Sequence, residues 1–362
     1  IRKTCGDDFI IGMSISYSEQ TPFVLQLDEL QEIISLHDQT GNLDYVSCGA
    51  GNYVDYDRVM PTFVHAEKLG TPLSAVLKSV VKNALVTAEC HVRTPENASA
   101  VISSNEADLV SIVRGQIADP HWVNKTLEGR PEDVRGCISC NQMCWGRRSR
   151  DYWISCLVNP SAGREFEWGG DRFDTATAIK KILVVGGGPA GMEAARVAAE
   201  RGHQVTLFEA ADKIGGQFNL AAAIPGKEEF FETIRYFGKQ IELTGVNLKL
   251  NTPVTADDLN AGDFDEVVLA TGIAPRLPEI EGIEHAKVLN YLDVLKHKIP
   301  VGKKVAVIGA GGIGFDVSEY LCHEGEATSQ NIPAFMKEWG VDMTLEARGG
   351  IEGIEAVVAP SA

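Results

Sequence analysis

One short stretch constrains the fold more than any other: an apolar run that leads directly into closely spaced glycines. It reads Lys181-Ile-Leu-Val-Val-Gly186-Gly-Gly188-Pro-Ala-Gly191. With G-x-G-x-x-G spacing, the first glycine permits a tight turn, the second lets the backbone approach a pyrophosphate, and the third lets a helix pack on the strand. The next apolar run ends in Glu209, which is placed to accept a hydrogen bond from a ribose hydroxyl. The stretch therefore predicts a dinucleotide site in an α/β domain.

The same spacing recurs further along, at Gly309, Gly311 and Gly314, after an apolar run over residues 303–308 that we interpret as a strand. Between the two motifs, another predicted strand ends in Ala270-Thr271-Gly272 and returns towards the first nucleotide. Two such motifs favour one site for a flavin dinucleotide and one for a nicotinamide. No acid that distinguishes NADH from NADPH follows the second motif.

The first 130 residues alternate short apolar runs with helical periods. Strands are predicted over residues 9–13, 43–48, 85–87 and 109–113, and helices over 27–40, over 59–69, from 95 and from 120. Four successive β/α units indicate a parallel sheet. Since they carry no dinucleotide fingerprint, they are also what half of an eight-fold β/α barrel would look like. A small doubly wound domain is the alternative.

Four of the eight cysteines lie within twenty residues, in the pattern C-x2-C-x3-C-x11-C, at Cys137, Cys140, Cys144 and Cys156. Thiolates are soft ligands that suit iron–sulfur clusters and zinc. Zinc ribbons usually pair two C-x2-C knuckles, whereas three close ligands and a distant fourth are typical of a four-cysteine [4Fe–4S] site. Structural zinc and free thiols are the alternatives.

Charge and hydropathy exclude several classes of protein. The 362 residues hold 33 basic and 50 acidic side chains, a net charge of −17, which disfavours binding to nucleic acid or to an anionic membrane. No apolar run approaches the ~20 residues of a membrane helix. Clustered cysteines without a secretory signal predict a reducing, cytoplasmic setting. The first residues look like the middle of a domain, so we expect an internal fragment.

Together these motifs resemble the iron–sulfur flavoenzymes of the old-yellow-enzyme group, which includes bacterial 2,4-dienoyl-CoA reductase and the trimethylamine and dimethylamine dehydrogenases. The order of motifs carries the resemblance: half a barrel, the cysteines, the first glycine motif, Gly215-Gly216-Gln217-Phe218-Asn219, Ala270-Thr271-Gly272 and the second glycine motif. Residues 224–231, 312–316 and 328–335 are closer to the dienoyl-CoA reductases. Residues 162–166 are closer to the amine dehydrogenases.

The resemblance implies four parts within an α/β chain. They are the C-terminal half of a (β/α)8 barrel that binds FMN (1–130), an iron–sulfur segment (131–172), a Rossmann-like FAD domain (180–290) and the start of an NAD(P)H-binding domain (291–362). It also implies a route: a hydride passes from NAD(P)H to FAD, and electrons then pass through the [4Fe–4S] cluster to FMN and the substrate. Gln217, Thr271 and Gly272 would join the first glycine motif in holding FAD.

The barrel half departs from this group at its flavin site. Ser14 stands where the group has an arginine near the flavin pyrimidine, and Cys90-His91 stands where a Gly-Arg pair feeds the flavin phosphate. Arg114 does match the arginine of the eighth strand. The resemblance therefore implies FMN binding by Arg114, with His91 or Arg93 as replacements for the missing charge. For both replacements, a solvated loop residue is the alternative.

The substrate loop also departs, because residues 51–58 hold no histidine where the dienoyl-CoA reductases have a Trp-His pair. Tyr53, Asp55 and Tyr56 are the candidate catalytic residues. A tyrosine can donate a proton to a reduced alkene. Equally, Asp55 and Tyr53 can hold an amine cation through charge and a cation–π contact, or the stretch is a polar surface loop.

Three functions follow as hypotheses. The first is an NAD(P)H-dependent reductase of a conjugated enoyl substrate such as 2,4-dienoyl-CoA, which the intact second glycine motif favours. The second is a dehydrogenase or demethylase of an N-methylated amine or amino acid that passes electrons outward. The third is a non-catalytic, cofactor-binding fragment. In the first two, the partner is a small-molecule substrate.

Overall fold

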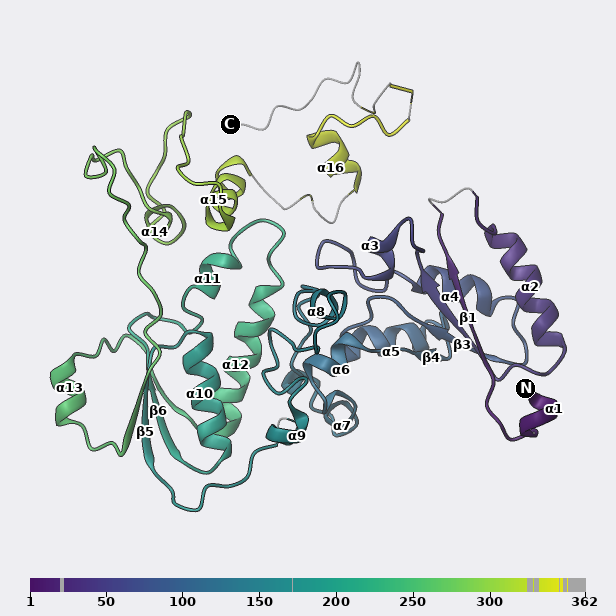
Figure 1. Ribbon diagram of the computed structural model, residues 1–362, viewed down its shortest axis with the longest axis horizontal. Helices are drawn as coiled ribbons and strands as arrows, with labels where there is room; N and C mark the ends of the chain where they lie inside the picture. The colour runs from purple at the N-terminus through teal and green to yellow at the C-terminus, as the bar shows by residue number, and fades with distance from the viewer. Residues whose placement is uncertain are drawn as a thin grey trace. The chain divides into compact units, whose positions relative to one another are not determined.

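The structure is a computed structural model of residues 1–362, and it describes residues 1–19, 23–170, 172–323, 328, 332–344, 346–347 and 350. The chain divides into two compact units, Ile1–Asp171 and Arg172–Ala362 (Figure 1). Each is an α/β unit around a parallel sheet of four strands. No helix among the described residues has the length and apolar character needed to cross a bilayer.

The first unit contains a sheet in the order β1-β2-β3-β4, with all neighbours parallel. Its elements are α1 (Arg2–Cys5), β1 (Gly12–Tyr17), α2 (Leu27–Gln39), β2 (Tyr45–Ala50), α3 (Tyr56–Val59), α4 (Thr71–Lys78), β3 (Leu85–Ala88), α5 (Pro95–Ser103), β4 (Leu109–Val110), α6 (Arg114–Ala118), α7 (Trp122–Leu127), the 3-10 turn η1 (Pro131–Asp133), α8 (Trp145–Arg148) and α9 (Glu165–Trp168). Each strand lies beside the next one in the sequence, without the reversal that defines a doubly wound sheet.

The two faces of this sheet differ in polarity. On one face, Ile34 of α2 and Leu77 of α4 pack against Val46 and Cys48 of β2, and all four are fully buried. The other face carries a polar row, in which Ser14 pairs with Ser47 and Ser47 with Thr87. Helices therefore cover one side of the sheet, and small polar side chains line the other.

Two predicted elements of this unit differ from the structure. The first strand begins at Gly12 rather than at residue 9, because the Arg2 guanidinium bonds to the carbonyls of residues 7 and 9. The predicted helix over 59–69 is wrong, since α3 ends at Val59 and α4 begins at Thr71. The carbonyls of Met60 and Pro61 accept hydrogen bonds from distant side chains, Asn141 and Arg114, instead of from a helical turn.

The second unit contains a sheet in the order β7-β6-β5-β8. Its elements are β5 (Lys181–Val185), α10 (Pro189–Glu200), β6 (Gln204–Phe208), α11 (Phe218–Ala221), α12 (Phe230–Thr244), β7 (Asn247–Lys249), α13 (Ala256–Ala261), β8 (Glu266–Leu269), α14 (Tyr291–Leu295), α15 (Gly312–Cys322) and α16 (Ile332–Glu338). The chain builds outward from β5 through β6 to β7 and then returns to the other side of β5. Such a reversal leaves a crevice at the carboxyl ends of the strands, where nucleotides bind in open α/β sheets.

The core of this unit lies between the sheet and helices α10 and α12 (Figure 1). Val184, Met192 and Leu207 are fully buried, and Tyr236 and Phe237 of α12 complete the cluster. β5 is apolar from Ile182 to Val185, which suits its place inside the sheet, between β6 and β8.

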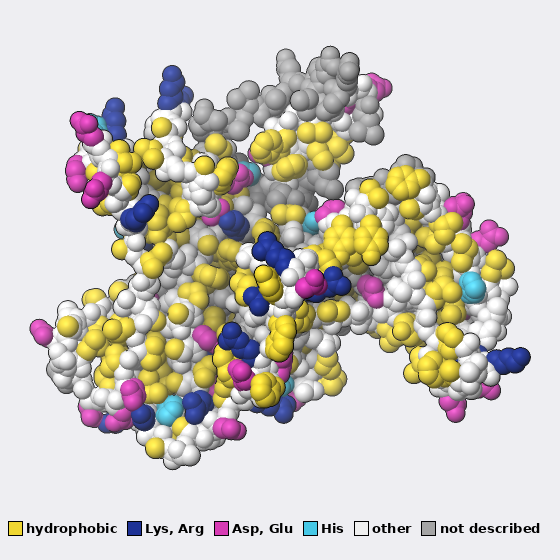
Figure 2. Space-filling view, in the orientation of Figure 1, with side chains coloured by type: hydrophobic (Ala, Val, Ile, Leu, Met, Phe, Trp, Pro, Cys, Tyr) yellow, Lys and Arg dark blue, Asp and Glu magenta, His cyan; other side chains and the backbone are white. Residues whose placement is uncertain are grey.

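The predicted strand over 303–308 is absent, because no described strand pairs with these residues. Val305, Val307 and Ile308 are 44%, 42% and 77% exposed. Hydrophobic side chains are visible on the surface of the molecule (Figure 2). A parallel strand needs a neighbour to satisfy its backbone groups. The predicted third domain, 291–362, extends past these residues into positions outside the described part of the chain.

Candidate functional site

The first glycine turn joins β5 to α10. Gly186 has a φ of +107°, a left-handed conformation that side chains disfavour. A Cβ atom at Gly191 would overlap the Gly186 carbonyl oxygen, whereas a Cβ at Gly188 would meet no atom within 4 Å. Packing therefore explains the first and third glycines, and the open space at the second leaves room for a ligand at the N-terminus of α10.

Glu209 follows β6 and stands beside this turn. Its Oε2 accepts a 2.6 Å hydrogen bond from the Gly187 amide, and its Oε1 accepts one of 2.8 Å from the Ala211 amide. These bonds fix the carboxylate against the glycine turn. An acid in this place is suited to a ribose hydroxyl of a dinucleotide.

Ala270-Thr271-Gly272 lies on the other side of the turn, directly after β8. A Cβ on Gly186 would collide with the Ala270 carbonyl, so the two segments are in close contact. Gln217 reaches the same region: its Nε2 donates to the Ile273 carbonyl at 3.1 Å, and its Oε1 accepts from the Tyr291 hydroxyl at 3.0 Å. The sequence reasoning did not single out Tyr291, which has no recognisable motif around it.

The second glycine turn has the same local geometry. Gly309 has a φ of +112°, and a Cβ at Gly314 would overlap the Gly309 carbonyl. Cβ atoms at Gly311 and Gly312 would meet nothing within 4 Å, and α15 begins at Gly312. One ion pair, 2.5 Å between Lys227 Nζ and Asp316 Oδ1, links α15 to the segment between α11 and α12.

The four clustered cysteines of the first unit line one cavity. Its walls also include Arg114 and Asn141. In the described part of the chain, no three His, Cys, Asp or Glu side chains converge around a single point. The four cysteines instead share the lining of the cavity, and four cysteine thiolates are the ligand set of a [4Fe–4S] cluster. The donor set thus fits the cluster that the spacing predicts.

Burial raises the pKa of the Cys137, Cys140 and Cys156 thiols. It raises the pKa of Cys156 to about 11, against the opposing effect of the Val158 and Asn159 backbone amides. It also raises the pKa of Cys137, although the Ser139 amide, 3.4 Å from Sγ, and two arginines oppose the rise. Such thiols lose their protons when a cationic metal centre binds, so metal binding and proton release are linked.

The residues proposed to replace a flavin-phosphate charge are buried beside this cysteine segment. His91 is 5% exposed, and its ring nitrogens contact the Ala66 carbonyl and the Ser139 hydroxyl, both at 2.9 Å. Arg93 is 8% exposed and donates to the Cys137 carbonyl at 2.8 Å. A solvated loop position, the alternative for both, does not match this burial.

Arg114, at the start of α6, also faces the cysteines. Its Nη1 lies 2.6 Å from the Pro61 carbonyl and 2.5 Å from Asn141 Oδ1. Ser14, by contrast, lies in the middle of β1 on the polar face of the sheet, with an exposed side chain. The sequence reasoning missed Ser139 and Asn141, which hydrogen-bond to His91 and Arg114, because nothing in their spacing marks them.

The three candidate catalytic residues have different surroundings. Tyr53 is 95% exposed and stacks on Tyr56, which in turn contacts Trp145 with ring centroids 5.5 Å apart. Asp55 is 5% exposed, and its carboxylate accepts bonds from the Asn52 amide and the Ser18 hydroxyl. Asp55 would have to give up these hydrogen bonds to contact a substrate, whereas the two tyrosines would not.

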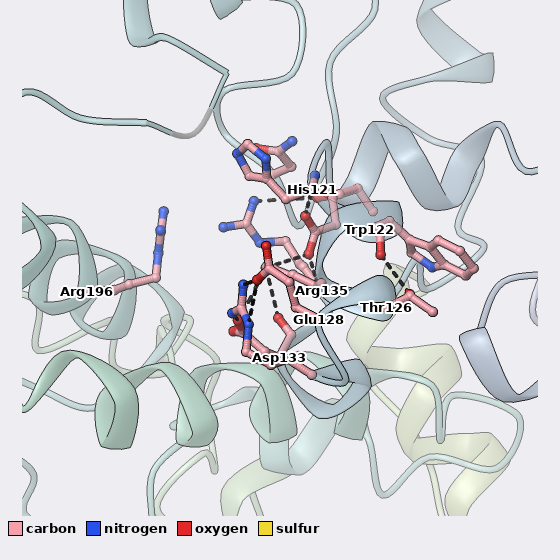
Figure 3. Close-up of polar contacts among 12 residues, drawn as sticks. His121, Trp122, Thr126, Glu128, Asp133, Arg135 and Arg196 are labelled. Atoms are coloured by element: carbon pink, nitrogen blue, oxygen red, sulfur yellow. Dashed lines mark hydrogen bonds and ion pairs between the residues drawn. The ribbon is translucent and has the colours of Figure 1, made fainter.

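A charged network fixes the segment that leads into the cysteines (Figure 3). Asp119 accepts bonds of 2.8 Å from Lys125 Nζ and from the Arg135 amide, and Lys125 also donates to the Asp133 carbonyl. Burial alone would raise the pKa of Asp119, but Lys125 and the backbone amides outweigh it and hold that pKa below its usual range. The network thereby anchors residues 133–135 to α7.

Known proteins with similar sequences support this description. Residues 180–348 match the family described as pyridine nucleotide-disulphide oxidoreductase. The match covers most of the second unit, Arg172–Ala362.

Longer matches cover both units. An NADH oxidase from Thermoanaerobacter brockii is 34% identical over 95% of this chain and 52% of its own length. A cinnamate reductase from Clostridium sporogenes is 33% identical over 90% of this chain and 50% of its own. The structure of a 2-naphthoyl-CoA reductase complexed with 2-naphthoyl-CoA matches with a TM-score of 0.83, at 33% identity, over 92% of this chain and 52% of that one.

These matches confirm the resemblance of the chain to the iron–sulfur flavoenzymes of the old-yellow-enzyme and dienoyl-CoA reductase group. The chain spans about half the length of the curated relatives it matches.

Proposed function

We propose that this chain belongs to an NAD(P)H-dependent iron–sulfur flavoprotein oxidoreductase that reduces a conjugated enoyl substrate such as 2,4-dienoyl-CoA. One observation carries the proposal: the second glycine turn, Gly309–Gly314, has the same local backbone geometry as the first. An enzyme that takes electrons from a nicotinamide needs this second site. Similarity to an NADH oxidase and a cinnamate reductase supports this assignment.

Each part of the chain has a role in this proposal. The iron–sulfur ligands are the cysteines that line the cavity, Cys137, Cys140, Cys144 and Cys156. FAD binds to the first glycine turn and its neighbours, Gly186, Gly188, Gly191, Glu209, Gln217, Thr271 and Gly272. The nicotinamide nucleotide binds at Gly309, Gly311 and Gly314. When bound, these groups supply electron transfer from the nicotinamide through FAD and the cluster to FMN and the alkene.

FMN is assigned to the first unit, as the C-terminal half of a (β/α)8 barrel. The strand order β1-β2-β3-β4 supports this assignment, because barrel strands follow one another in sequence. In barrels of this kind, ligands bind at the carboxyl ends of the strands. Arg114 lies after β4, and His91 and Arg93 lie after β3, at that edge of the sheet.

We assign proton donation to Tyr53 or Tyr56. Both follow β2 in the sequence. When a hydride adds to one carbon of a conjugated alkene, negative charge develops on the other carbon, and a tyrosine hydroxyl can protonate that carbon. Asp55 instead holds the loop closed through Ser18 and Asn52. The free thiols of the cysteine segment suit a reducing compartment such as the cytoplasm.

A second candidate function is the oxidation of an N-methylated amine. Similarity to an N,N-dimethylglycine/sarcosine dehydrogenase, 34% identical over 90% of this chain, favours it, as does the loop 51–58 without a histidine. The burial of Asp55 weighs against it, since a cation would need a carboxylate that faces the substrate.

The test is anaerobic reduction of the reconstituted holoprotein by NADPH or NADH, followed by addition of a 2,4-dienoyl-CoA. Rapid reoxidation of the flavin is the expected result. If the nicotinamide reduces the flavin and the thioester does not reoxidise it, the enoyl substrate is wrong. Bleaching of oxidised flavin by an N-methylated amine would then support the second candidate. A chain that retains neither flavin nor iron would favour the non-catalytic hypothesis.

A further inference from the structure

The loop after β3 is tied to the cysteine segment by two buried side chains. His91 Nε2 lies 2.9 Å from the Ser139 hydroxyl, and Arg93 Nη1 donates to the Cys137 carbonyl at 2.8 Å. Ser139 stands between Cys137 and Cys140 and is itself fully buried. Both contacts therefore fall within the C-x2-C turn, where they act on the backbone that carries two of the four thiols.

A third contact holds the next turn of the same segment. Arg114 Nη1 bonds to Asn141 Oδ1, and Asn141 Nδ2 donates to the Met60 carbonyl at 2.6 Å. Asn141 immediately follows Cys140. The three side chains thus contact consecutive parts of the stretch 137–141, two of them from the loop after β3 and the third from the start of α6.

The backbone of this stretch needs such support. Ser139 and Asn141 have φ values of +49° and +54°, and His91 has one of +65°. Residues other than glycine adopt this left-handed region at an energetic cost, and they hold it where surrounding contacts fix them. The hydrogen bonds that His91 and Arg114 make to this stretch involve its two left-handed residues, Ser139 and Asn141.

The far ends of these side chains are also fixed. His91 Nδ1 contacts the Ala66 carbonyl at 2.9 Å, and Arg93 Nη2 lies 2.5 Å from Glu67 Oε1. The Trp122 indole donates to the Arg93 carbonyl at 3.1 Å. A flavin phosphate would have to compete with bonds that are already made on both sides of His91.

We propose that His91, Arg93 and Arg114 are positioning residues for the iron–sulfur cluster, which hold the turn Cys137–Asn141 in its ligating shape. The inference rests on the proposed cluster and changes the role of three residues that the family resemblance assigns to FMN. Loss of one contact loosens the C-x2-C turn, so the cluster is lost faster and its electronic environment changes.

The test compares His91→Ala, His91→Gln, Ser139→Ala and Ser149→Ala after anaerobic reconstitution with iron, sulfide, FMN and FAD. Ser139→Ala removes the same contact from the cluster side and does not alter the loop after β3. Ser149→Ala is the matched control, because Ser149 is exposed and bonds only locally to the Gly146 carbonyl. The measurements are iron per chain, the rate of bleaching by a chelator, the electron paramagnetic resonance spectrum after reduction, and FMN per chain.

We expect His91→Ala and Ser139→Ala to bleach at least fivefold faster than the unaltered protein, with altered resonance spectra and unchanged FMN content. His91→Gln should recover part of the loss, and Ser149→Ala should match the unaltered protein. If His91→Ala loses FMN while Ser139→Ala bleaches normally, His91 serves the phosphate and the inference is wrong. If the unaltered protein takes up no four-iron cluster, the proposed function itself fails.

Discussion

The two glycine turns of the second unit have one sequence pattern and two different surroundings. At both, the first glycine is left-handed, with φ values of +107° at Gly186 and +112° at Gly309, and the last glycine touches the carbonyl of the first. The strand before the first turn is buried between β6 and β8. The stretch before the second turn has no described strand beside it, and Ile308 is 77% exposed.

This difference distinguishes structure that depends on nearby residues from structure that depends on residues elsewhere in the chain. The shape of the turn depends on glycines five residues apart, so the sequence alone determines it. The strand before it depends on neighbours that come from elsewhere in the chain, so the same apolar pattern gives a strand in one place and irregular backbone in the other. The two turns therefore offer matched pairs of substitutions.

The largest expected difference concerns Gly191→Ala and Gly314→Ala. Each new Cβ would overlap a backbone carbonyl, but of the two helices that carry these glycines, only α10 packs on a described sheet. We expect Gly191→Ala to lower the unfolding free energy by about 3 kcal/mol and to abolish FAD retention. Gly314→Ala should change the unfolding free energy by about 1 kcal/mol or less, yet block flavin reduction by NAD(P)H. Thermal melts and FAD content would measure both, and equal destabilisation would contradict the comparison.

A smaller effect is expected from Gly188→Ala and Gly311→Ala. Neither Cβ would meet an atom within 4 Å, and both residues have φ values that any residue adopts. The folded state should therefore be unaffected, while the methyl group blocks close approach of a pyrophosphate. We expect FAD affinity to fall about tenfold or more in the first variant, and the KM for the nicotinamide to rise similarly in the second. If the FAD affinity and the KM for the nicotinamide are both unchanged, Gly188 and Gly311 do not lie against the ligands.

Glu209→Gln tests the acid that only the first turn possesses in the described residues. The carboxylate accepts bonds from two backbone amides, and an amide side chain can replace only one acceptor oxygen. We expect a loss of about 1–2 kcal/mol in FAD binding, since hydrogen bonds to a charged group are worth about that much. Equilibrium dialysis would measure it. Asp257→Asn, which removes the charge of an exposed carboxylate on α13 and leaves Glu209 intact, is the control.

The smallest effect is expected at the ion pair that links the second turn to the rest of its unit. Lys227 and Asp316 are each about 30% exposed, and partly exposed pairs contribute at most about 1 kcal/mol. A double-mutant cycle with Lys227→Met and Asp316→Asn should give a coupling energy of about 0.5 kcal/mol that decreases in high salt. A coupling several times larger would mean that the second turn depends on this contact for its position.

Much of the fold follows from periodicity in the sequence. The helices over 27–39 and from 95, the four strands of the first sheet and β5, β6 and β8 of the second agree in type with the predictions, whereas β7 was not predicted. The errors come from tertiary hydrogen bonds that no local pattern reveals. The carbonyls of Met60 and Pro61 accept hydrogen bonds from Asn141 and Arg114, which lie far along the chain. The predicted helix is absent there for this reason.

The candidate sites divide in the same way. The glycine and cysteine spacings each lie within a short segment, so the candidate sites at these segments could be predicted from the sequence. The family resemblance pointed to His91 and Arg93. No pattern in the sequence predicts that both side chains contact the cysteine turn. Ser139 and Asn141 had no signal at all, since a serine and an asparagine beside cysteines have no characteristic spacing.

The strand orders of the two sheets have a consequence for synthesis on the ribosome. In the first sheet every strand pairs with the strand made just before it, so the sheet can grow one unit at a time as the chain emerges. In the second, β5 must wait for β8, which is made only after β6, β7 and four intervening helices. Until then one long side of β5 is exposed to water and to other nascent chains. A pause in translation between β7 and β8 would therefore leave the second unit, rather than the first, open to aggregation.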